Sequence, residues 1–346
     1  MARKQVVSPY GSDEDRVSDL ALRPKRLDEF VGQNPLKEIL SIAIEAATRR
    51  GDALDHVLLY GPPGLGKTTL AMIIANELGV HSDFTSGPVL QKKLDLTGVL
   101  TTMQKRQVFF VDEIHRLLAD VEEMLYSALE DYRVDLVVGT GPGARMHSIP
   151  VAPFTAIGAT TRQGLISAPL RARFGITLRI NPYDTVDLTR IVFRSAGLLG
   201  VEITDDAAEE IARRSRGTPR IANRLLRRVR DYSEVRADGH VTHEVAVTAL
   251  DMLEVDPLGL DEIDRKIMET ILGKYSGGPV GLNTISASVG EDAHTIEEVY
   301  EPYLMQLGFL DRTHRGRVGT LVAYEHFDMT PPAGIQPTLG FLGADT

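Results

Sequence analysis

The chain has 346 residues, 43% of them hydrophobic and 25% charged, with a formal net charge of −10 and no cysteine. This length allows two or three domains with cores of their own, and the lack of cysteine excludes disulfides and thiolate metal sites. No apolar run approaches membrane-spanning length and the first residues lead into no signal-peptide core, so a cytoplasmic location is expected. The acidic balance argues against a surface that binds nucleic acid everywhere, but it permits a local basic patch.

A glycine-rich loop, Gly61–Thr69, is the most informative motif. It follows the apolar run Val57–Tyr60, a predicted buried strand, and precedes a helical pattern that continues to Leu78. Strand, glycine loop and helix are the context of a P-loop, whose backbone N–H groups bind phosphate. We expect Lys67 to reach the β- and γ-phosphates and the Thr68 hydroxyl to ligate Mg²⁺. A dinucleotide-binding loop is excluded because no third glycine follows.

Two carboxylates follow the next predicted strand, Val108–Val111. In a P-loop sheet that strand end lies beside the phosphate loop, so Asp112 is placed to hold Mg²⁺ through water. Glu113 is placed to take a proton from an attacking water. An Asp-Glu pair favours ATP hydrolysis, and the guanine-reading pattern Asn-Lys-x-Asp is absent.

A β-hairpin is predicted where Arg133–Val138 and Arg145–Val151 flank the turn Gly139–Gly143. Apolar residues on a projecting hairpin indicate a partner surface. The alternative is that one hairpin face packs on its own domain. The residues concerned include Leu136, Val138, Met146 and Ile149.

A third predicted strand, Phe154–Gly158, is followed by Thr160 and Thr161. A hydroxyl there is suited to hold the hydrolytic water or the γ-phosphate, although threonine also simply favours strands. Further on, Arg171 and Arg173 end a short helical pattern. They either complement a helix C-terminus or present an arginine to the nucleotide of a neighbouring subunit.

Three domains are predicted. Apolar strands alternate with helical patterns in residues 1–183, which indicates an α/β domain with a parallel sheet. Strand signals stop in residues 184–254, which predicts a small all-helical domain. There Thr218 and Pro219 mark a helix start, and Arg220 in the first turn indicates an anion to meet, because the helix dipole disfavours a cation at that end.

The last domain, residues 257–346, follows a linker at Asp256–Gly259. Its pattern is helix, helix-turn-helix and β-hairpin, the order of a winged helix. The helices are expected at Asp261–Leu272, Asn283–Val289 and His294–Leu307, and the strands at Phe309–Arg312 and Val318–Tyr324. The tail from Pro331 is expected to be mobile.

These motifs occur in the order found in AAA+ ATPases, and together with Leu22–Lys25, Phe30–Gln33 and the winged helix the whole chain resembles the RuvB family, the motors of Holliday-junction branch migration. The resemblance implies a hexameric ring that binds ATP and Mg²⁺ and drives duplex DNA through four-way junctions in recombination, DNA repair and the SOS response. It implies that the hairpin docks on RuvA and that RuvC joins the full complex.

The resemblance also implies residue roles. Thr161 corresponds to sensor 1, Arg173 to the arginine finger that acts on a neighbouring subunit, and Arg220 to sensor 2. The residues expected around the nucleotide are Leu22, Arg23, Gly64, Lys67, Thr68, Thr69, Glu130, Asp131, Tyr132 and Tyr183.

Basic residues cluster at the expected wing, where Arg312, Arg315 and Arg317 surround His314. A motor that moves along DNA must not read sequence, so these arginines are expected to contact phosphates, and Gly316 to let the wing tip approach the DNA backbone. The alternative is a solvated hairpin tip. A second arginine cluster, within residues 213–230, suits nucleotide sensing, subunit contacts or a charged helix face equally well.

Two other classes share part of this pattern. An AAA+ loader or initiator has the same nucleotide motifs and differs in the domain that comes after the helical one. A DNA-binding regulator uses ATP only as a switch, but the Gly-Ala-Phe-Thr-Gly-Ala loop of sigma-dependent activators is absent, and a non-enzymatic module has no need of Glu113.

Overall fold

The structure, a computed structural model, describes residues 20–138 and 145–332, so the expected hairpin turn and most of the C-terminal tail lie outside the described residues. The chain divides into two compact units. Among the described residues, the first unit comprises those up to Ile191 together with Thr218–Arg220, and the second comprises Val192–Gly217 and the described residues from Ile221 onward.

The first unit contains a five-stranded parallel sheet in the order β2-β3-β6-β1-β7. The α/β prediction is therefore confirmed, and the three central strands are the three apolar runs of the sequence. Two edge strands were not predicted from the sequence. The strands are β1 (Val57–Tyr60), β2 (Ser82–Ser86), β3 (Val108–Asp112), β6 (Thr155–Thr160) and β7 (Ile176–Arg179).

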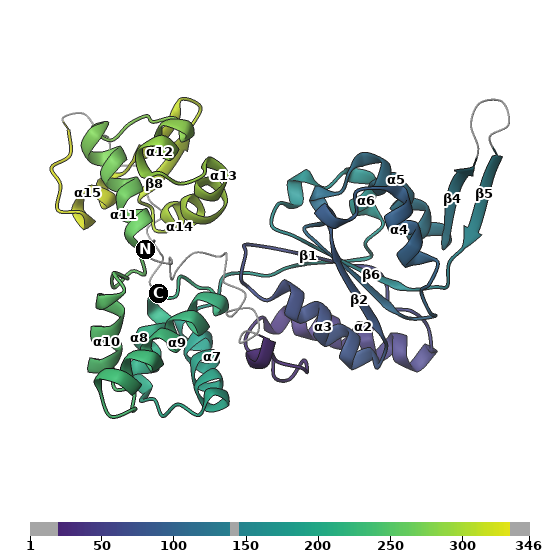
Figure 1. The fold of residues 1–346 in the computed structure, drawn as a ribbon, viewed down its shortest axis with the longest axis horizontal. Helices are drawn as coiled ribbons and strands as arrows, with labels where there is room; N and C mark the ends of the chain where they lie inside the picture. The colour runs from purple at the N-terminus through teal and green to yellow at the C-terminus, as the bar shows by residue number, and fades with distance from the viewer. Residues whose placement is uncertain (1–19, 139–144, 333–346) are drawn as a thin grey trace. The chain divides into compact units, whose positions relative to one another are not determined.

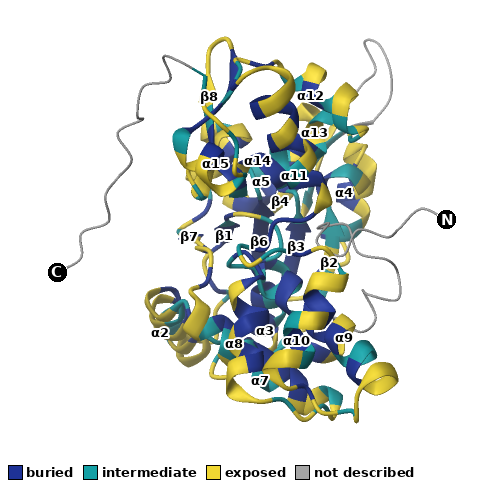
Figure 2. Ribbon diagram, turned by 90° about the vertical axis from the view of Figure 1, so that its left-hand side faces the viewer, coloured by how far each residue is buried: buried dark blue, intermediate teal, exposed yellow. Residues whose placement is uncertain are grey.

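Helices cover both faces of this sheet, with α2 and α3 on one side and α4, α5 and α6 on the other (Figure 1). Burial on both faces explains why the central strands are continuously apolar, and Figure 2 shows them buried. The helices are α2 (Asn34–Arg50), α3 (Lys67–Leu78), α4 (Lys93–Leu100), α5 (Ala119–Asp131) and α6 (Ala168–Ala172).

The predicted hairpin is present as β4 (Arg133–Val138) and β5 (Arg145–Pro150), paired antiparallel and extending away from the sheet (Figure 1). Leu136 packs against the core of the α/β domain, whereas Met146 is 73% exposed. The hairpin therefore packs on its own domain through Leu136, while Met146 is exposed to solvent.

The second unit contains the predicted helical lid and winged helix. The lid helices are α7 (Thr185–Leu199), α8 (Asp205–Arg213), α9 (Pro219–Arg236) and α10 (His243–Met252), of which α7 and α9 begin in the first unit. The winged helix contains α11 (Glu262–Glu269, continued by the π-turn Thr270–Lys274), α12 (Leu282–Val289), α13 (Ala293–Thr295), α14 (Glu301–Gln306), β8 (Leu310–Thr313), β9 (Gly316–Gly319) and α15 (Leu321–His326). A π-turn, Ile296–Tyr300, joins α13 to α14.

The prediction of a strand over Val318–Tyr324 was wrong beyond Gly319. Thr320 is the N-cap of α15 and its hydroxyl accepts a hydrogen bond from the Ala323 N–H at 3.3 Å. The apolar run thus contains a helix start, and Tyr324 packs in the core as a helical residue.

The arginines between residues 213 and 230 form mainly structural ion pairs. Arg214 donates to Glu210 at 2.7 Å and to Asp251 at 2.6 Å within the lid. Arg216 donates to the Gly259 carbonyl at 2.6 Å and pairs with the fully buried Asp264 of the winged helix. Within the second unit, this guanidinium links the lid to the winged helix.

Candidate nucleotide site and DNA interface

The glycine-rich loop connects β1 to α3 and requires glycine at two positions. Gly61 has φ 147°, and a Cβ there would lie 2.3 Å from the Ile180 carbonyl oxygen. Gly64 has φ 82°, and a Cβ there would lie 2.7 Å from the Thr218 methyl. Neither position has room for a side chain, so the loop conformation depends on these glycines.

Lys67 is the first residue of α3 and its side chain is buried. Its ammonium donates to the carbonyls of Gly61 and Pro62, each at 2.8 Å. Burial lowers the pKa of Lys67 to about 8, although the negative charges of Glu113 and Asp112 oppose this shift. The buried ammonium has lost much of its hydration. An anion that binds at the loop would therefore stabilise the charged form of Lys67.

Thr68, at the start of α3, contacts Asp112, at the end of β3. The Thr68 hydroxyl donates to Asp112 Oδ2 at 3.2 Å, and Asp112 Oδ1 accepts the N–H of Glu113 at 2.9 Å. A hydroxyl and a carboxylate side by side are hard oxygen donors of the kind that Mg²⁺ prefers.

Glu113 follows β3 with a left-handed backbone, φ 47°. Its Oε2 accepts a hydrogen bond from the Thr161 hydroxyl at 3.3 Å. Burial and the neighbouring Asp112 raise the pKa of Glu113, while Lys67 and the Thr161 hydrogen bond oppose the shift. The structure thus brings a carboxylate of raised basicity beside the end of β6.

The two threonines at the end of β6 differ in surroundings. Thr161 contacts Glu113, whereas Thr160 is fully buried and lies 2.9 Å from Nδ1 of His115. Sequence reasoning did not single out His115. Its one available signal was a polar ring two residues after the carboxylate pair.

Arg220 lies in the first turn of α9, where the sequence placed it. A Cβ built on Gly64 would be 3.3 Å from the Arg220 Cβ, and the positive charge of Arg220 contributes to lowering the pKa of Lys67. Two cations therefore approach the same loop, as a polyanion site requires.

Three further residues expected around the nucleotide are Leu22, Arg23 and Tyr183. Leu22 and Tyr183 are buried, and the Tyr183 hydroxyl donates to the Leu65 carbonyl at 3.5 Å. Arg23 donates to the sulfur of Met72, on α3, at 3.4 Å.

Four expected site residues lie near the amino-terminal ends of the strands, whereas the phosphate loop follows the carboxyl-terminal end of β1. Arg173 stands three residues before β7, whose first residue pairs with the first residue of β1, whereas the phosphate loop follows the last residue of β1. Glu130, Asp131 and Tyr132 end α5, where the Leu129 carbonyl lies 3.0 Å from His56, which directly precedes β1. The structure therefore does not bring these residues to the phosphate loop of their own chain.

Arg173 and Glu130 pair with each other near these amino-terminal strand ends. The Arg173 side chain is 32% exposed, and among the described residues its Nε has no hydrogen-bond partner. The Nε–H of Arg173 is therefore a hydrogen-bond donor without an acceptor among the described residues.

On the winged helix, Arg312 and Arg317 are direct cross-strand neighbours. Arg312, 51% exposed, donates to Glu297 at 2.6 Å. Arg317 is buried and donates two hydrogen bonds to the Glu301 carboxylate, at 2.6 and 3.1 Å. Since like charges opposite each other repel, the two glutamates stabilise the arginine pair.

The residues of the wing differ in exposure and packing. Arg317 does not extend freely into solvent, because Glu301 holds it against the domain. Gly316 is needed for packing within the domain, since a Cβ there would lie 2.5 Å from the Val280 carbonyl oxygen. Arg315 and His314 are exposed at the tip, as expected.

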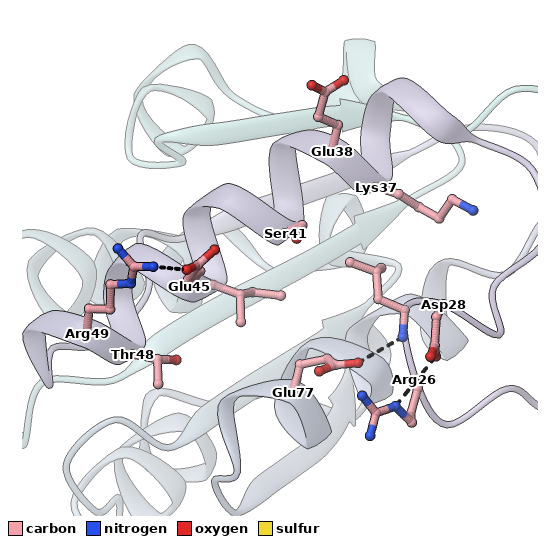
Figure 3. A pocket seen from close by; sticks show the side chains of 11 residues that line it. Arg26, Asp28, Lys37, Glu38, Ser41, Glu45, Thr48, Arg49 and Glu77 are labelled. Atoms are coloured by element: carbon pink, nitrogen blue, oxygen red, sulfur yellow. Dashed lines mark hydrogen bonds and ion pairs between the residues drawn. The ribbon is translucent and has the colours of Figure 1, made fainter.

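A cavity of about 630 Å³ lies elsewhere on the first unit, between α2 and residues 26–28 (Figure 3). Its lining carries both signs of charge, including the pairs Arg26–Asp28 and Arg49–Glu45. These two pairs leave no excess of positive charge among the arginines of the lining, unlike the convergent cations of the phosphate loop.

Two features are absent from residues 20–138 and 145–332. No helix in these stretches is long and apolar enough to cross a membrane. In the same stretches no three His, Asp or Glu side chains gather as a set of metal ligands.

Family models match nearly the whole chain. Residues 22–180 match the Holliday junction DNA helicase RuvB P-loop domain, residues 183–256 the RuvB AAA lid domain, and residues 257–328 the RuvB C-terminal winged helix domain.

Two curated proteins, each called Holliday junction branch migration complex subunit RuvB, are similar over nearly their full length. That of Solibacter usitatus is 69% identical over 327 residues, covering 94% of this chain and 95% of that protein. That of Koribacter versatilis is 61% identical over 330 residues, covering 95% and 92%.

Solved structures of Thermotoga maritima RuvB have the same fold. A lysine-to-arginine mutant superposes with a TM-score of 0.83 at 53% identity, covering 90% of this chain and 99% of that one. The structure called the RuvB Holliday junction branch migration motor superposes with a TM-score of 0.81 at 53% identity, covering 90% and 100%.

The lowered pKa of Lys67 predicts proton uptake on nucleotide binding. At about pH 9 the unliganded lysine is largely neutral, and phosphates favour its ammonium form, so binding raises its pKa and takes up a proton. Calorimetry with a non-hydrolysable ATP analogue, in two buffers of different ionisation enthalpy, should give different apparent enthalpies at about pH 9 and nearly equal ones at about pH 7.

Lys67→Arg is the matched control, since arginine stays charged at both pH values and should show no proton uptake. Equal enthalpies for the wild-type protein at the higher pH would contradict the account of Lys67.

Proposed function

The chain belongs to the RuvB family of AAA+ ATPases, and from this membership we propose that it is a hexameric ring motor that translocates duplex DNA to drive Holliday junction branch migration in recombination and repair. As a family member it binds and hydrolyses ATP. The observation that carries the proposal is the separation of Arg173 from the phosphate loop by the length of β1. Such a chain completes its hydrolysis site only in an assembly.

The residues of one chain divide the work of hydrolysis. Lys67 and the loop N–H groups bind the β- and γ-phosphates, with Thr69 beside them, and Arg220 contacts the γ-phosphate from α9. Glu113 takes a proton from water as the water oxygen bonds to the γ-phosphorus, and the bond to the β,γ-bridging oxygen breaks, which leaves ADP and phosphate. Thr161 holds the same carboxylate.

Mg²⁺ fits the oxygen pair of Thr68 and Asp112, which lie 3.2 Å apart. The Thr68 hydroxyl would ligate the ion directly and Asp112 would hold it through water, since in nucleotide sites Mg²⁺ keeps several water ligands beside the phosphates. When bound, it neutralises charge on the phosphate oxygens.

A neighbouring chain supplies the other half of the site. Arg173, with Glu130, Asp131 and Tyr132 beside it at the amino edge of the sheet, faces the phosphate loop of the next subunit. A guanidinium there stabilises the charge that develops on the γ-phosphate. Pairing with Glu130 holds Arg173 in place within its own chain.

The wing contacts DNA phosphates through Arg312 and Arg315 and, from its anchored position, through Arg317. A guanidinium has five N–H donors, and Glu301 takes one on Nε and one on Nη2 of Arg317, so donors remain for a phosphate. Contacts of this kind carry no sequence information, as translocation requires.

Two partner proteins complete the proposal. The exposed Met146 and the projecting strands β4 and β5 suit docking on RuvA. RuvC is proposed as a further partner on family membership alone.

Dissociation of a synthetic four-way junction tests the function. Wild-type protein with ATP and RuvA should separate the junction into duplex products. Glu113→Gln should bind ATP but leave the junction intact, because the substituted amide takes no proton from water. Junction separation by Glu113→Gln would overturn the assignment. A wild-type protein that hydrolyses ATP yet never separates junctions would favour the loader or regulator class.

We expect substitutions of two neighbouring charged residues of the winged helix, Arg312 and Glu297, to change duplex binding in opposite directions. Arg312→Ala should weaken duplex binding at all sequences and reduce the salt slope by about one. Glu297→Gln should strengthen binding, because the carboxylate that competes with phosphate for Arg312 is removed.

Fluorescence anisotropy across a salt series measures both variants. Glu262→Gln is the matched control, since it changes the domain charge equally but its carboxylate pairs with Lys266 on α11. Weaker binding by Glu297→Gln would contradict the account of the wing.

A further inference from the structure

His115 joins the ends of two strands of the hydrolysis site. It lies in the short turn Ile114–Arg116 that follows Glu113, and its side chain is 8% exposed. Its Nδ1 lies 2.9 Å from the Thr160 hydroxyl and 3.2 Å from Glu113 Oε2. One ring nitrogen therefore faces a hydroxyl on β6 and a carboxylate that follows β3.

The position of the proton on the ring can be inferred from these neighbours. The Thr160 hydroxyl oxygen already accepts the N–H of Arg162 at 2.9 Å. If Thr160 donated to Nδ1, the nitrogen lone pair would be used and no donor would face the carboxylate of Glu113. A single proton on Nδ1 can be shared by both oxygens in a bifurcated hydrogen bond, so the Nδ1–H form suits this site.

Two donors then converge on one carboxylate oxygen. Glu113 Oε2 receives the His115 Nδ1–H and the Thr161 hydroxyl at 3.2 and 3.3 Å. Glutamate has three rotatable side-chain bonds, and this one sits on a turn with a left-handed backbone. With the Thr161 backbone N–H, which also bonds this carboxylate, these contacts fix the orientation of the carboxylate toward the site where water must stand.

We propose that His115 is a positioning residue for ATP hydrolysis, which holds Glu113 through Nδ1 while Thr160 holds the ring. The proposal rests on the role proposed above for Glu113 as the base. His115 itself contacts no reacting atom. Removing it should leave nucleotide binding unchanged and slow the chemical step, because a misplaced base forfeits rate without loss of affinity.

Three substitutions at this position separate a hydrogen-bonding role from a space-filling one. His115→Ala removes the donor, and kcat should fall about 10- to 100-fold with KM and analogue affinity unchanged. His115→Asn places an amide N–H at the position of Nδ1 and should recover most of the loss. His115→Gln places its amide near the position of Nε2 and should recover less.

His81→Ala is the control, a histidine exposed beside β2 whose charged neighbour is Asp83, and it should behave as wild type. Thermal unfolding of every variant accompanies the kinetics.

Full kcat in His115→Ala would overturn the proposal. Equal loss in the Ala and Asn variants, with weaker analogue binding or a lower Tm, would also overturn it by indicating a packing role. If Glu113→Gln hydrolyses ATP normally, the base assignment fails first. If Glu113→Gln is inactive and His115→Ala is normal, only the inference about His115 fails.

Discussion

The parallel pairing of β1 with β6 and β7, and of β6 with β3, is the constraint on which the site depends. Parallel strands place all their carboxyl ends at one edge, so the phosphate loop, Glu113 and Thr161 meet there although they lie far apart in sequence. The same register sends Arg173 to the opposite edge. One topological fact thus assembles the proposed hydrolysis site and leaves Arg173 outside it.

Burial at the carboxyl edge then tunes the chemistry. It lowers the pKa of Lys67 to about 8 and raises that of Glu113, and each charge moderates the shift of the other. Thr161 adds a hydrogen bond to the carboxylate, and His115 Nδ1 lies 3.2 Å from the same oxygen. Burying the charged side chains of Lys67 and Glu113 costs free energy of desolvation, and their attraction for each other offsets part of that cost.

The sequence was sufficient where the signal is local. Glycine spacing and continuous apolar runs predicted the loop and three central strands, but β2, with sequence Ser-Asp-Phe-Thr-Ser, is a half-exposed edge strand whose existence depends on pairing with β3. The burial of Arg317 depends on Glu301, 16 residues away, and no local pattern reports such a pair. The role of His115 likewise depends on β6 lying beside β3.

The claim that the site is shared between subunits is tested most directly by complementation. Lys67→Ala lacks a working phosphate loop but keeps Arg173, and Arg173→Ala has the converse defect. The account predicts that each protein alone is inactive and that a mixture regains ATPase activity, because some loops then face an intact arginine. A mixture no more active than its components would contradict the shared site.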